Sequence, residues 1–393
     1  MSVTFPEGIR AAGVASGIKG DGALDLAFVG FSDGGAHVGA AVFTKSAAAA
    51  APVQVSRDHL RTSKGRIRGV VLSSGNANAL TGGAGLDAAR LMASLAVANL
   101  GGEDSEYLVC STGLIGIPFP VERIEPGLAL LAAELGTDPH AGERAAHAIR
   151  TTDTFAKEAQ AVGDGFRVGG MAKGAAMIAP NMATMLCVLT TDATLTLERA
   201  QSALGWVVDQ TFNRITIDGC TSTNDTVVLL ASEVGSEPGP DFEESLLEVA
   251  AKLAYAIVSD AEGGSKVGRV RVHGGASVSE AEACARRVAS SLLVKCSLLG
   301  GDPYWGRVLA EVGNALPEAD VSAASVAYQG IRVCEGGLDA SAQLSGADRR
   351  RLDHRMQERE IVIEIDLGRG SESVEVLTAD IGHGYLEENR GTS

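Results

Sequence analysis

The alternation of apolar and polar residues predicts several β-strands in the second half of the chain. Residues 270–273 (VRVH) and 360–367 (EIVIEIDL) alternate in the way that half-buried strands do. Residues 325–336 (SVAYQGIRVCEG) predict two short strands that are joined by a turn at the central Gln-Gly pair. The apolar, β-rich residues 184–191 (TMLCVLTT) indicate a longer strand that is buried.

Helices are predicted between these strands. Apolar residues at helical spacing predict helices over 242–259 (FEESLLEVAAKLAYAIVS) and over 85–100. Ser277 and Glu280 form a capping-box pattern, which marks the start of a helix, and we expect that helix to run to about Ser290. The whole pattern is typical of a mixed α/β protein.

The charge of the chain argues against two classes of partner. There are 49 Asp and Glu residues against 33 Lys and Arg residues, which gives a formal net charge of −16 over 393 residues. So acidic a chain is repelled by nucleic-acid phosphates and by an anionic membrane surface. The uncharged run 174–191 is interrupted by Pro180 and Asn181, and we therefore expect no transmembrane helix there. We also see no secretory signal at the N-terminus.

The cysteines and histidines are spread along the chain without the spacing of metal ligands. No Cys-x-x-Cys or His-x-x-x-His pair occurs in the sequence. We expect no metal site, and we expect the cysteines to be the buried, reduced thiols of a cytoplasmic protein. The six cysteines are Cys110, Cys187, Cys220, Cys284, Cys296 and Cys334.

Two short motifs that often carry chemistry do not fit this chain. Gly83-Ala-Gly85-Leu-Asp-Ala88 matches a loose dinucleotide fingerprint, but it does not follow the preceding strand-like segment directly, so the tight turn that cradles a pyrophosphate is missing. Ser16-Gly-Ile-Lys19 matches the Ser-x-x-Lys pattern of some acyl-enzymes, but the other motifs of that class are absent. We therefore predict neither nucleotide binding nor a serine acyl-enzyme.

The junction between Ala183 and Thr184 suits a chain that cuts itself. A small residue precedes the threonine, a proline-containing loop comes before it, and the predicted buried strand follows. The threonine hydroxyl can attack the carbonyl of Ala183, which gives an ester that water then opens. The freed α-amine has an ordinary pKa of about 7.7–8.0, so it can act as a base near neutral pH. On this pattern alone, an ordinary start of a strand is the alternative.

Longer segments that follow one another in a fixed order make the interpretation more specific. They are 11–29 (AAGVASGIKGDGALDLAFV), 74–82 (SGNANALTG), 110–116 (CSTGLIG), 151–154 (TTDT), 173–193 (KGAAMIAPNMATMLCVLTTDA), 217–226 (IDGCTSTNDT), 260–266 (DAEGGSK), 293–295 (LVK), 301–307 (GDPYWGR) and 384–389 (GYLEEN). In sequence and in order they resemble the ornithine acetyltransferase family, the bifunctional glutamate N-acetyltransferases of arginine biosynthesis. The segment 173–193 is similar to the family's processing site.

The resemblance implies the roles of three residues in acyl transfer. Thr184 is the implied nucleophile and a substrate-binding residue; it is freed by cleavage after Ala183 and carries the acetyl group as an ester. Such an ester divides one transfer between two amines into two easier steps. Thr112 and Gly113 match the oxyanion-hole residues, and a hydroxyl and an unhindered backbone N–H are suitable donors. Without the resemblance, Thr112 and Gly113 would be interpreted as a turn.

The resemblance also implies a site for N2-acetylornithine and glutamate, which share an α-carboxylate. Lys173 matches a substrate-binding residue and suits this carboxylate, and its alternative is a solvated surface lysine. Glu262 suits the ammonium group of ornithine, and its alternative is an exposed residue in a glycine-rich turn. Thr151 matches a substrate contact or else caps a helix. Asn389 and the terminal Ser393 match the tail that closes the site in the family, although terminal residues usually fray.

For the architecture, the resemblance implies a layered αββα sandwich-like core of the self-processing threonine-nucleophile type, with a second, smaller C-terminal α/β lobe. The core lobe would span about 1–274 and the C-terminal lobe about 275–393. Self-cleavage would give an α segment, 1–183, and a β segment, 184–393, and the resemblance implies a heterotetramer of two α and two β chains. We expect a cytoplasmic enzyme without a cofactor, and acetyl-CoA is a candidate second acetyl donor.

Some positions depart from the family's pattern and bear on substrate choice. Tyr304 and Ser73 stand in place of asparagines, Leu80 in place of a cysteine and Ala176 in place of a glycine, and the tail lacks its usual tyrosine and is one residue short. Two other functions stay open. One is an N-terminal-threonine amidohydrolase of the same fold, which passes the acyl group to water. The other is a catalytically silent paralogue, which would stay uncut.

Overall fold

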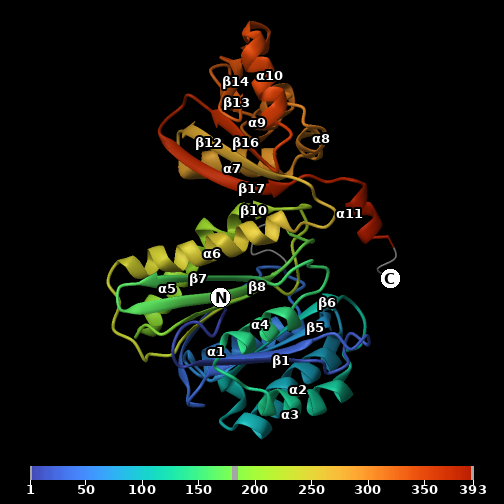
Figure 1. Cartoon of the computed structure of the whole chain (residues 1–393), viewed down its shortest axis with the longest axis vertical. Coiled ribbons are helices and arrows are strands. Elements are labelled where there is room, and N and C mark those ends of the chain that lie inside the picture. Colours follow the sequence, from blue (N-terminus) through green and yellow to red (C-terminus); the bar gives the residue numbers. More distant parts are fainter. Residues whose placement is uncertain (1, 179–184, 391–393) are drawn as a thin grey trace. The chain divides into compact units, whose positions relative to one another are not determined.

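The computed structural model describes residues 2–178 and 185–390, and the chain divides into two compact units. Unit 1 consists of Met1–Asn213 and Thr221–Ile257, and unit 2 consists of Arg214–Cys220 and Val258–Ser393. Figure 1 labels the helices and strands of both units. Each unit has its own hydrophobic core, so each is described by itself.

Unit 1 contains two β-sheets, with the strand orders β1-β2-β5-β6 and β4-β3-β11-β9-β8-β7. The first sheet consists of β1 (Ile9–Val14), β2 (Leu26–Phe31), β5 (Gly69–Asn76) and β6 (Tyr107–Leu114). The second consists of β3 (His37–Phe43), β4 (Arg66–Ile67), β7 (Lys157–Gly163), β8 (Phe166–Lys173), β9 (Leu186–Thr191) and β11 (Thr226–Ala231). Every residue of β2, β9 and β11 is buried, as expected of strands that are covered on both faces.

The two sheets of unit 1 pack face to face. Alternate residues of a strand point to opposite faces, and those that point inward share one apolar cluster. In that cluster Val29 and Leu72 of the first sheet lie with Val188 and Val228 of the second. The unit therefore has a double-sheet core.

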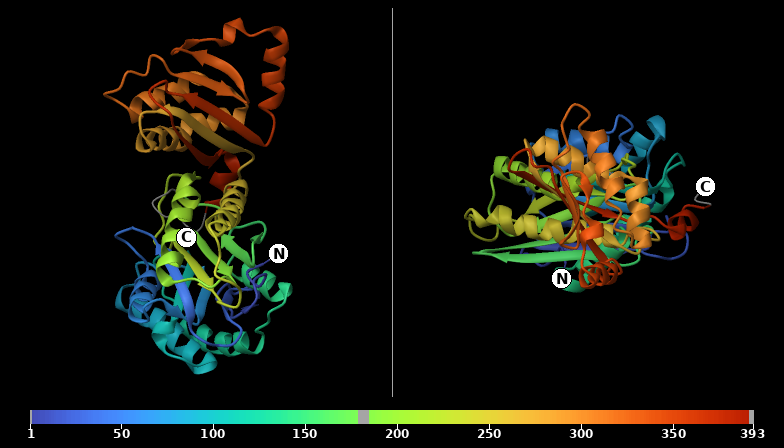
Figure 2. Two further views of the ribbon diagram at one scale, coloured as in Figure 1. Left: turned by 90° about the vertical axis from the view of Figure 1, so that its left-hand side faces the viewer. Right: turned by 90° about the horizontal axis from the view of Figure 1, so that it is seen from above.

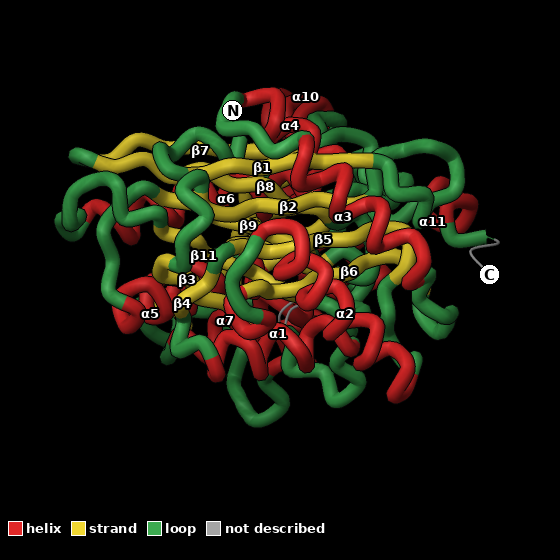
Figure 3. The backbone as a smooth tube through the Cα atoms, turned by 90° about the horizontal axis from the view of Figure 1, so that it is seen from below, coloured by secondary structure: helices red, strands yellow, loops and turns green. Residues whose placement is uncertain are grey.

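Helices cover the outer face of each sheet. They are α1 (Ala51–Thr62), α2 (Gly82–Leu100), α3 (Ile124–Ala133), α5 (Leu197–Gln210) and α6 (Asp241–Ser259). In contrast, α4 (Pro139–Ala148) contacts the edge strand β1, and its buried alanines belong to the cluster between the sheets. Phe28 and Val71 of the first sheet pack with Met92 of α2 and Leu128 of α3, and Figure 3 shows these helices over their strands. On the second sheet, Gly170 of β8 faces Leu253 of α6, and α5 contacts β3. These four layers confirm the predicted αββα core.

The strand pairing brings several strand ends of unit 1 to one edge. In the second sheet, β9 pairs antiparallel with β8, with Lys173 opposite Leu186, and parallel with β11, with Thr226 opposite Leu186. The end of β8 and the starts of β9 and β11 therefore lie side by side. In the first sheet, β5 and β6 are parallel, with Ser74 opposite Thr112, so these two strands also end together. Such ends leave side chains at the rim of a sheet, where they can form a site.

Unit 2 is built on a 7-stranded sheet with the order β10-β17-β12-β16-β13-β14-β15. These strands are β10 (Ile215–Thr216), β12 (Val267–Gly275), β13 (Ser325–Tyr328), β14 (Ile331–Glu335), β15 (Leu338–Asp339), β16 (Glu360–Asp366) and β17 (Glu372–Ala379). Its helices are α7 (Val278–Ser290), α8 (Leu292–Gly300), α9 (Trp305–Ala315), α10 (Gly346–Arg355) and α11 (His383–Glu388). Figure 2 shows this sheet and its helices in orange and red.

The two faces of this sheet differ in polarity. Ile361, Ile363 and Ile365 of β16 are buried in one cluster with residues of α7, α8, α9 and α10. On the other face Arg269 contacts Glu360 at 2.8 Å and Glu375 at 2.6 Å. The sequence placed the lobe boundary near residue 275, but β12 lies before that point and belongs to unit 2, because it pairs along its length with β16 and β17.

Most elements predicted from periodicity are confirmed. The predicted strands correspond to β9, β12, β13, β14 and β16, and the predicted helices to α2, α6 and α7. The side chain of Ser277 caps α7 by accepting a hydrogen bond from the N–H of Glu280 at 3.1 Å. The expectation of buried cysteines is wrong for two of the six: Cys220 lies in a loop and Cys296 on an exposed face of α8, and both are exposed. All six thiols are free.

No helix within residues 2–178 and 185–390 is both long and apolar enough to cross a membrane. The uncharged run 174–191 that the sequence analysis considered contains β9 rather than a helix in its described part.

Lys295 of α8 predicts how the stability of unit 2 depends on pH. Its buried ammonium donates hydrogen bonds to the Thr378 hydroxyl and, at 2.8 Å, to the Ala379 carbonyl. Burial lowers the pKa of Lys295 to about 7, although the charges of Asp218 and Asp380 oppose this shift. Between that pKa and the ordinary value of about 10.4, the unfolded chain binds a proton that the folded chain does not. This lysine should therefore make the protein more stable as the pH rises from about 7 to about 10.

Urea unfolding at several pH values in this range tests that expectation. The free energy of unfolding of the natural protein should rise with pH, and the Lys295→Met variant should lose most of this slope. Parallel slopes for the two proteins would show that another group causes the dependence.

Candidate functional site

The candidate site begins with a contact between two residues from different sheets of unit 1. Lys173 is the last residue of β8, and Thr112 lies near the end of β6. The Lys173 ammonium donates a hydrogen bond of 3.1 Å to the Thr112 hydroxyl. Both side chains are buried, Lys173 with 4% exposure and Thr112 with 5%. Lys173 is therefore no solvated surface lysine, and Thr112 belongs to a strand rather than to a turn.

Gly113 follows Thr112 where β6 leaves the core. Its φ angle is 131°, a conformation that residues with a side chain rarely adopt. A Cβ atom at this position would lie only 2.3 Å from the carbonyl carbon of Gly75, which is its partner in β5. Close approach of two backbones therefore requires glycine here. The residue is exposed, so its backbone is accessible to a ligand.

Asp153 connects the segments around this contact. Its Oδ1 accepts hydrogen bonds of 2.7 Å from the Lys157 ammonium and of 2.7 Å from the N–H of Gly174, the residue after Lys173. Its Oδ2 accepts a bond of 3.0 Å from the N–H of Thr151. One carboxylate thus fixes the loop that carries Thr151 and the end of β8 that carries Lys173. Thr151 comes after the end of α4 at Ala148. It therefore does not cap the start of a helix, which was the alternative role for this residue.

Charge keeps Asp153 ionised although it is buried. Burial by itself would raise the pKa of this carboxyl. The positive charges of Lys173 and Lys157 and the N–H of Gly174 outweigh burial and lower the pKa of Asp153 to about 2. The carboxylate is therefore negative at neutral pH, and it compensates part of the positive charge around it.

Asp225 is a second buried carboxyl group at the same edge, and sequence reasoning did not identify it. It precedes β11, is fully buried, and its Oδ1 accepts a hydrogen bond of 2.9 Å from the N–H of Met185. Burial raises the pKa of Asp225 well above its ordinary value, and the charge of Lys173 opposes this shift. Met185 directly follows Thr184 in the sequence. Asp225 therefore fixes the chain one residue beyond the predicted nucleophile.

Buried asparagine side chains join the asparagine-rich loop, residues 74–82, to the strands that carry the site. Asn224 donates hydrogen bonds of 2.6 Å to the Ala77 carbonyl and of 2.8 Å to the Ser111 carbonyl, so it joins the start of β11 to that loop and to β6. Within the loop, the Asn78 amide accepts a hydrogen bond of 2.8 Å from the Thr81 hydroxyl and donates one of 2.9 Å to the Gly85 carbonyl at the start of α2. These buried amides position the backbone beside Thr112.

Three of the predicted residues cannot be placed. Ala183, Thr184 and Ser393 lie outside the described residues. Their roles stay predictions. The described chain resumes at Met185, which Asp225 holds directly before β9.

Two further predicted residues meet within unit 2. The Asn389 amide donates a hydrogen bond of 2.7 Å to Oε2 of Glu262. The tail that carries Asn389 is fastened at α11, where Gly263 and Gly384 approach so closely that a Cβ atom on Gly263 would lie 2.2 Å from the carbonyl carbon of Gly384. Tyr385 donates a hydrogen bond of 3.3 Å to Asp218. This part of the tail is thus tied to the turn that carries Glu262.

The positions that depart from the family pattern have ordinary structural surroundings. Ser73 is buried and donates a hydrogen bond of 2.9 Å to the Ser111 hydroxyl, whereas Leu80 is 69% exposed. In unit 2 the guanidinium of Arg307 lies 5.5 Å from the ring centre of Tyr304. Ala176 is half-buried. Ser73 is linked to the described contact, because Ser111, to which it donates, directly precedes Thr112.

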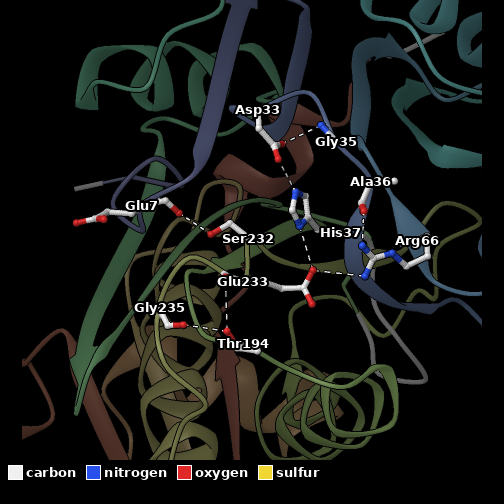
Figure 4. Close-up of polar contacts among 10 residues, drawn as sticks. All are labelled: Glu7, Asp33, Gly35, Ala36, His37, Arg66, Thr194, Ser232, Glu233 and Gly235. Atoms are coloured by element: carbon white, nitrogen blue, oxygen red, sulfur yellow. Dashed lines mark hydrogen bonds and ion pairs between the residues drawn. The ribbon is translucent and has the colours of Figure 1, made fainter.

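A separate group of charged residues lies at the other end of β11. His37 lies 3.0 Å from Glu233 and 2.9 Å from Asp33, and Arg66 lies 3.4 Å from Glu233 (Figure 4). Asp225 comes just before β11 and Glu233 just after it, and a strand of this length spans about 20 Å. The His37 group therefore links strand ends on the opposite side of the second sheet and lies away from Lys173 and Thr112.

The arrangement of Lys173, Thr112 and Gly113 can hold an anion next to two hydrogen-bond donors, the Thr112 hydroxyl and the Gly113 N–H. The Thr112 oxygen accepts the hydrogen bond from Lys173, so its own hydroxyl hydrogen can be donated to a ligand. Sequence reasoning missed the carboxylates that support this arrangement, Asp153 and Asp225. Both lie inside segments that were singled out, 151–154 and 217–226, but neither residue type nor spacing reveals that they are buried. Among the described residues no group of three or more His, Cys, Asp or Glu side chains could hold a metal ion.

Comparisons with known proteins identify a family. The family model described as the ArgJ family matches residues 10–391. The arginine biosynthesis bifunctional protein ArgJ of Thermobifida fusca is 45% identical over 395 residues, which cover 100% of both chains. The protein of the same name from Mycobacterium tuberculosis strain H37Rv is 44% identical over 401 residues, which cover 100% of this chain and 96% of its own.

Two solved structures are also similar. The ornithine acetyltransferase of Mycobacterium tuberculosis, solved in complex with ornithine, is 41% identical with a TM-score of 0.40 and covers 46% of this chain and 94% of its own. The arginine biosynthesis bifunctional protein ArgJ of Bacillus halodurans is 29% identical with a TM-score of 0.47 and covers 51% of this chain and 96% of its own.

The Asp153 carboxylate should be essential for the stability of unit 1. Asp153→Asn removes the negative charge next to the buried ammonium of Lys157, and removing one partner of a buried ion pair typically costs about 3–5 kcal/mol. The double variant Asp153→Asn, Lys157→Met should recover part of this loss. Urea unfolding at pH 7 measures both effects.

The exposed Asp164 of the same unit provides the control, because Asp164→Asn makes the same charge change without burial. Since the pKa of Asp153 is lowered to about 2, its contribution should be complete above pH 4 and should decline as the pH falls toward 2. Equal stability of the Asp153→Asn and Asp164→Asn variants at pH 7 would contradict this role.

Proposed function

The chain belongs to the ArgJ family, and we propose that it transfers the acetyl group of N2-acetylornithine to glutamate. It is an acetyltransferase of arginine biosynthesis, and its products are ornithine and N-acetylglutamate. The observation that carries this proposal in the structure is the buried contact between Lys173 and Thr112 at the edge where β9 begins. It places a cation and a hydroxyl donor beside the chain that leads back to Thr184.

The first step is self-cleavage. The Thr184 hydroxyl attacks the carbonyl carbon of Ala183, the C–N bond breaks, and the hydroxyl proton passes to the released nitrogen. Water then opens the ester, which gives a carboxylate on Ala183 and a free threonine at position 184. The bond from Asp225 to the N–H of Met185 supports this step, because it holds the chain on one side of the attacking residue.

The second step loads the acetyl group. The hydroxyl of Thr184 attacks the acetyl carbonyl carbon of N2-acetylornithine, with the α-amine of Thr184 as the base. A C–O bond forms, the C–N bond breaks, and the proton moves from the α-amine to the departing nitrogen, so ornithine leaves. Glutamate then enters, its amine attacks the ester carbonyl, and the proton returns to the threonine oxygen. The reaction is therefore ping-pong, with acetyl-Thr184 as its intermediate.

Thr112 and Gly113 supply the donors for the oxyanion that forms in each attack. Because Lys173 donates to the Thr112 oxygen, the hydroxyl hydrogen of Thr112 is available for another acceptor. The positive charge of Lys173 also makes that hydroxyl a better donor. Gly113 is exposed and has no side chain, so its N–H can approach the same oxygen. Donors that are fixed before the reaction stabilise such charge most effectively.

Lys173 also binds the α-carboxylate that both substrates share. The ammonium group is buried beside Thr112, where it can donate to a carboxylate that enters this region. Thr151, fixed by Asp153, and Thr184 complete the contacts of the substrate within this region. Glu262, Asn389 and Ser393 are further substrate-binding residues in this proposal. The bond between Glu262 and Asn389 supports their acting together.

The reaction as proposed needs no cofactor. Acetyl-CoA is a second candidate donor for the same threonine, since its thioester delivers the same acetyl group. We further propose that the two segments stay together as a heterotetramer of two α and two β chains in the cytoplasm. The family membership supports these statements.

Thr184→Ala should abolish both cleavage and acetyl transfer. Intact-mass measurement of the natural protein should give two fragments, 1–183 and 184–393, whereas the variant stays whole because it lacks the attacking hydroxyl. Brief exposure to N2-acetylornithine should add one acetyl group to the 184–393 fragment. Thr184→Ser, which keeps a hydroxyl, is the matched control and should still be cut.

The same experiment separates the alternatives. Ornithine release at the same rate with and without glutamate would favour an amidohydrolase. An uncut natural protein without transfer would identify a silent paralogue.

Thr112→Val should slow acetyl transfer by about 10²–10³-fold, which is the usual effect of losing one oxyanion donor. Valine has nearly the shape of threonine, so the buried position stays filled. Thr112→Ser keeps the hydroxyl and should retain most of the activity. Initial rates of ornithine release measure both variants. A Thr112→Val variant with more than a tenth of the natural rate would exclude the hydroxyl as a donor.

A further inference from the structure

The region around Thr112 in unit 1 contains a third cationic side chain, Lys19, besides Lys173 and Arg150. Burial lowers the pKa of Lys19, and the positive charges of Arg150 and Lys173 lower it further, against the opposing charges of Asp25 and Asp21. Three cations therefore share one region of a chain whose net charge is −16. Asp25 and Asp21 compensate part of this charge, and an anion bound among the three cations would be stabilised by them.

Two of these cations already have defined tasks. Lys173 donates to Thr112. Arg150 donates through Nη2 and Nε to the backbone carbonyl of Asp153, at 2.6 and 3.1 Å, and its Nη1 lies 3.1 Å from Nδ1 of His147. These bonds hold Arg150 against the protein. Lys19 is the cation whose function remains to be explained.

The backbone around Lys19 is fixed by the buried carboxylate of Asp25. Oδ1 of Asp25 accepts bonds of 2.6 Å from the N–H of Ser16 and of 2.8 Å from its hydroxyl. Oδ2 accepts bonds of 3.0 Å from the N–H of Gly17 and of 3.1 Å from the N–H of Lys19. Asp25 has no exposed surface, so four donors converge on a rigid acceptor. The Ser16-to-Lys19 segment, which matched an acyl-enzyme pattern, is thus a loop that presents a lysine.

This loop directs Lys19 toward the oxyanion segment. A Cβ atom on Gly75 would lie 3.1 Å from Cγ of Lys19, so the stem of the lysine passes directly over Gly75. Gly75 is the strand partner of Gly113. The lysine stem therefore lies over β5, the strand that pairs with β6 at Gly113.

The Lys19 ammonium keeps donors available for a ligand. It donates one hydrogen bond of 2.7 Å to the carbonyl of Leu24. An ammonium has three donors, so two remain. Lys19 is half-buried rather than enclosed, and a ligand that reaches Gly113 is able to meet it.

We propose that Lys19 binds the side-chain carboxylate of glutamate and thereby selects the acceptor. This inference rests on the proposed function, in which Lys173 holds the α-carboxylate common to both substrates. Glutamate and N-acetylglutamate have a second carboxylate, whereas ornithine and N2-acetylornithine have a side-chain ammonium. Lys19 attracts the side-chain carboxylate of the former, whereas the side chain of the latter offers no acceptor to its donors. It therefore contributes to the glutamate half of the ping-pong cycle and not to the ornithine half.

Steady-state kinetics can separate the two halves. In a ping-pong reaction, kcat/KM for each substrate reports only on the half-reaction of that substrate. Lys19→Gln should lower kcat/KM for glutamate by about 10- to 100-fold, the usual effect of losing one charge-assisted hydrogen bond. It should leave kcat/KM for N2-acetylornithine within a factor of about two, since ornithine carries no second carboxylate.

Glutamine as the acceptor makes the test sharper, because it has the shape of glutamate without the side-chain charge. The natural enzyme should prefer glutamate to glutamine, and Lys19→Gln should lose most of this preference. Lys19→Arg keeps the charge and should restore part of it. Lys252→Gln, at an exposed lysine of α6, is the control for the loss of one positive charge from unit 1.

Two results would overturn the inference. One is an equal fall of kcat/KM for both substrates in Lys19→Gln, which would place Lys19 on the shared carboxylate or in a structural role. The other is a natural enzyme that transfers acetyl groups to glutamate and glutamine equally well, and this measurement requires no variant to fold. A natural protein that transfers no acetyl group at all would instead refute the proposed function.

Discussion

The buried ion pair between Asp153 and Lys157 holds the candidate site of unit 1 together. Neither side chain has any exposed surface, so the pair forms in a region of low dielectric where an isolated charge would be costly. The second partner of Oδ1 is the N–H of Gly174, directly after Lys173, and Oδ2 holds the loop of Thr151. Because of this single carboxylate, the end of β8 is fixed so that Lys173 is buried next to Thr112 rather than extended into water.

The layered fold explains why these residues meet at all. Lys173 and Thr112 lie 61 residues apart and belong to different sheets of the sandwich. The antiparallel pairing of β8 with β9 and the parallel pairing of β9 with β11 bring the end of β8, Met185 and Asp225 to one rim. Thr184 directly precedes Met185 in the sequence. The chain that follows it is held by Asp225 at Met185 and by hydrogen bonds to β8 and β11 along β9. Such rigidity favours a defined direction of attack.

The charge distribution of the chain is uneven in a way that suits small anionic substrates. The chain as a whole is strongly acidic, yet Lys19, Arg150 and Lys173 influence one another in unit 1. The carboxylates nearest to them are already engaged: Asp25 accepts bonds from the loop that it fixes, and Asp153 accepts bonds from Lys157 and from two backbone N–H groups. The charge of each of these cations acts locally, because its range in physiological salt is about one Debye length of 8 Å. It therefore acts on a bound amino acid and has little effect on distant partners.

The sequence by itself determined the class of the fold and predicted candidate residues for the reaction, because periodicity and long motifs are local properties of the chain. Strands such as β12 and β16, the helix capped by Ser277, and the segments around Thr112 and Lys173 could all be recognised in this way. Only the tertiary structure decided that Lys173 is buried on Thr112, that Asp153 and Asp225 support the site, and that Lys19 lies over Gly75. These contacts join residues far apart in the chain, and the burial that sets their charge exists only after the two sheets have packed. No pattern of residue types along a single strand or loop contains that information.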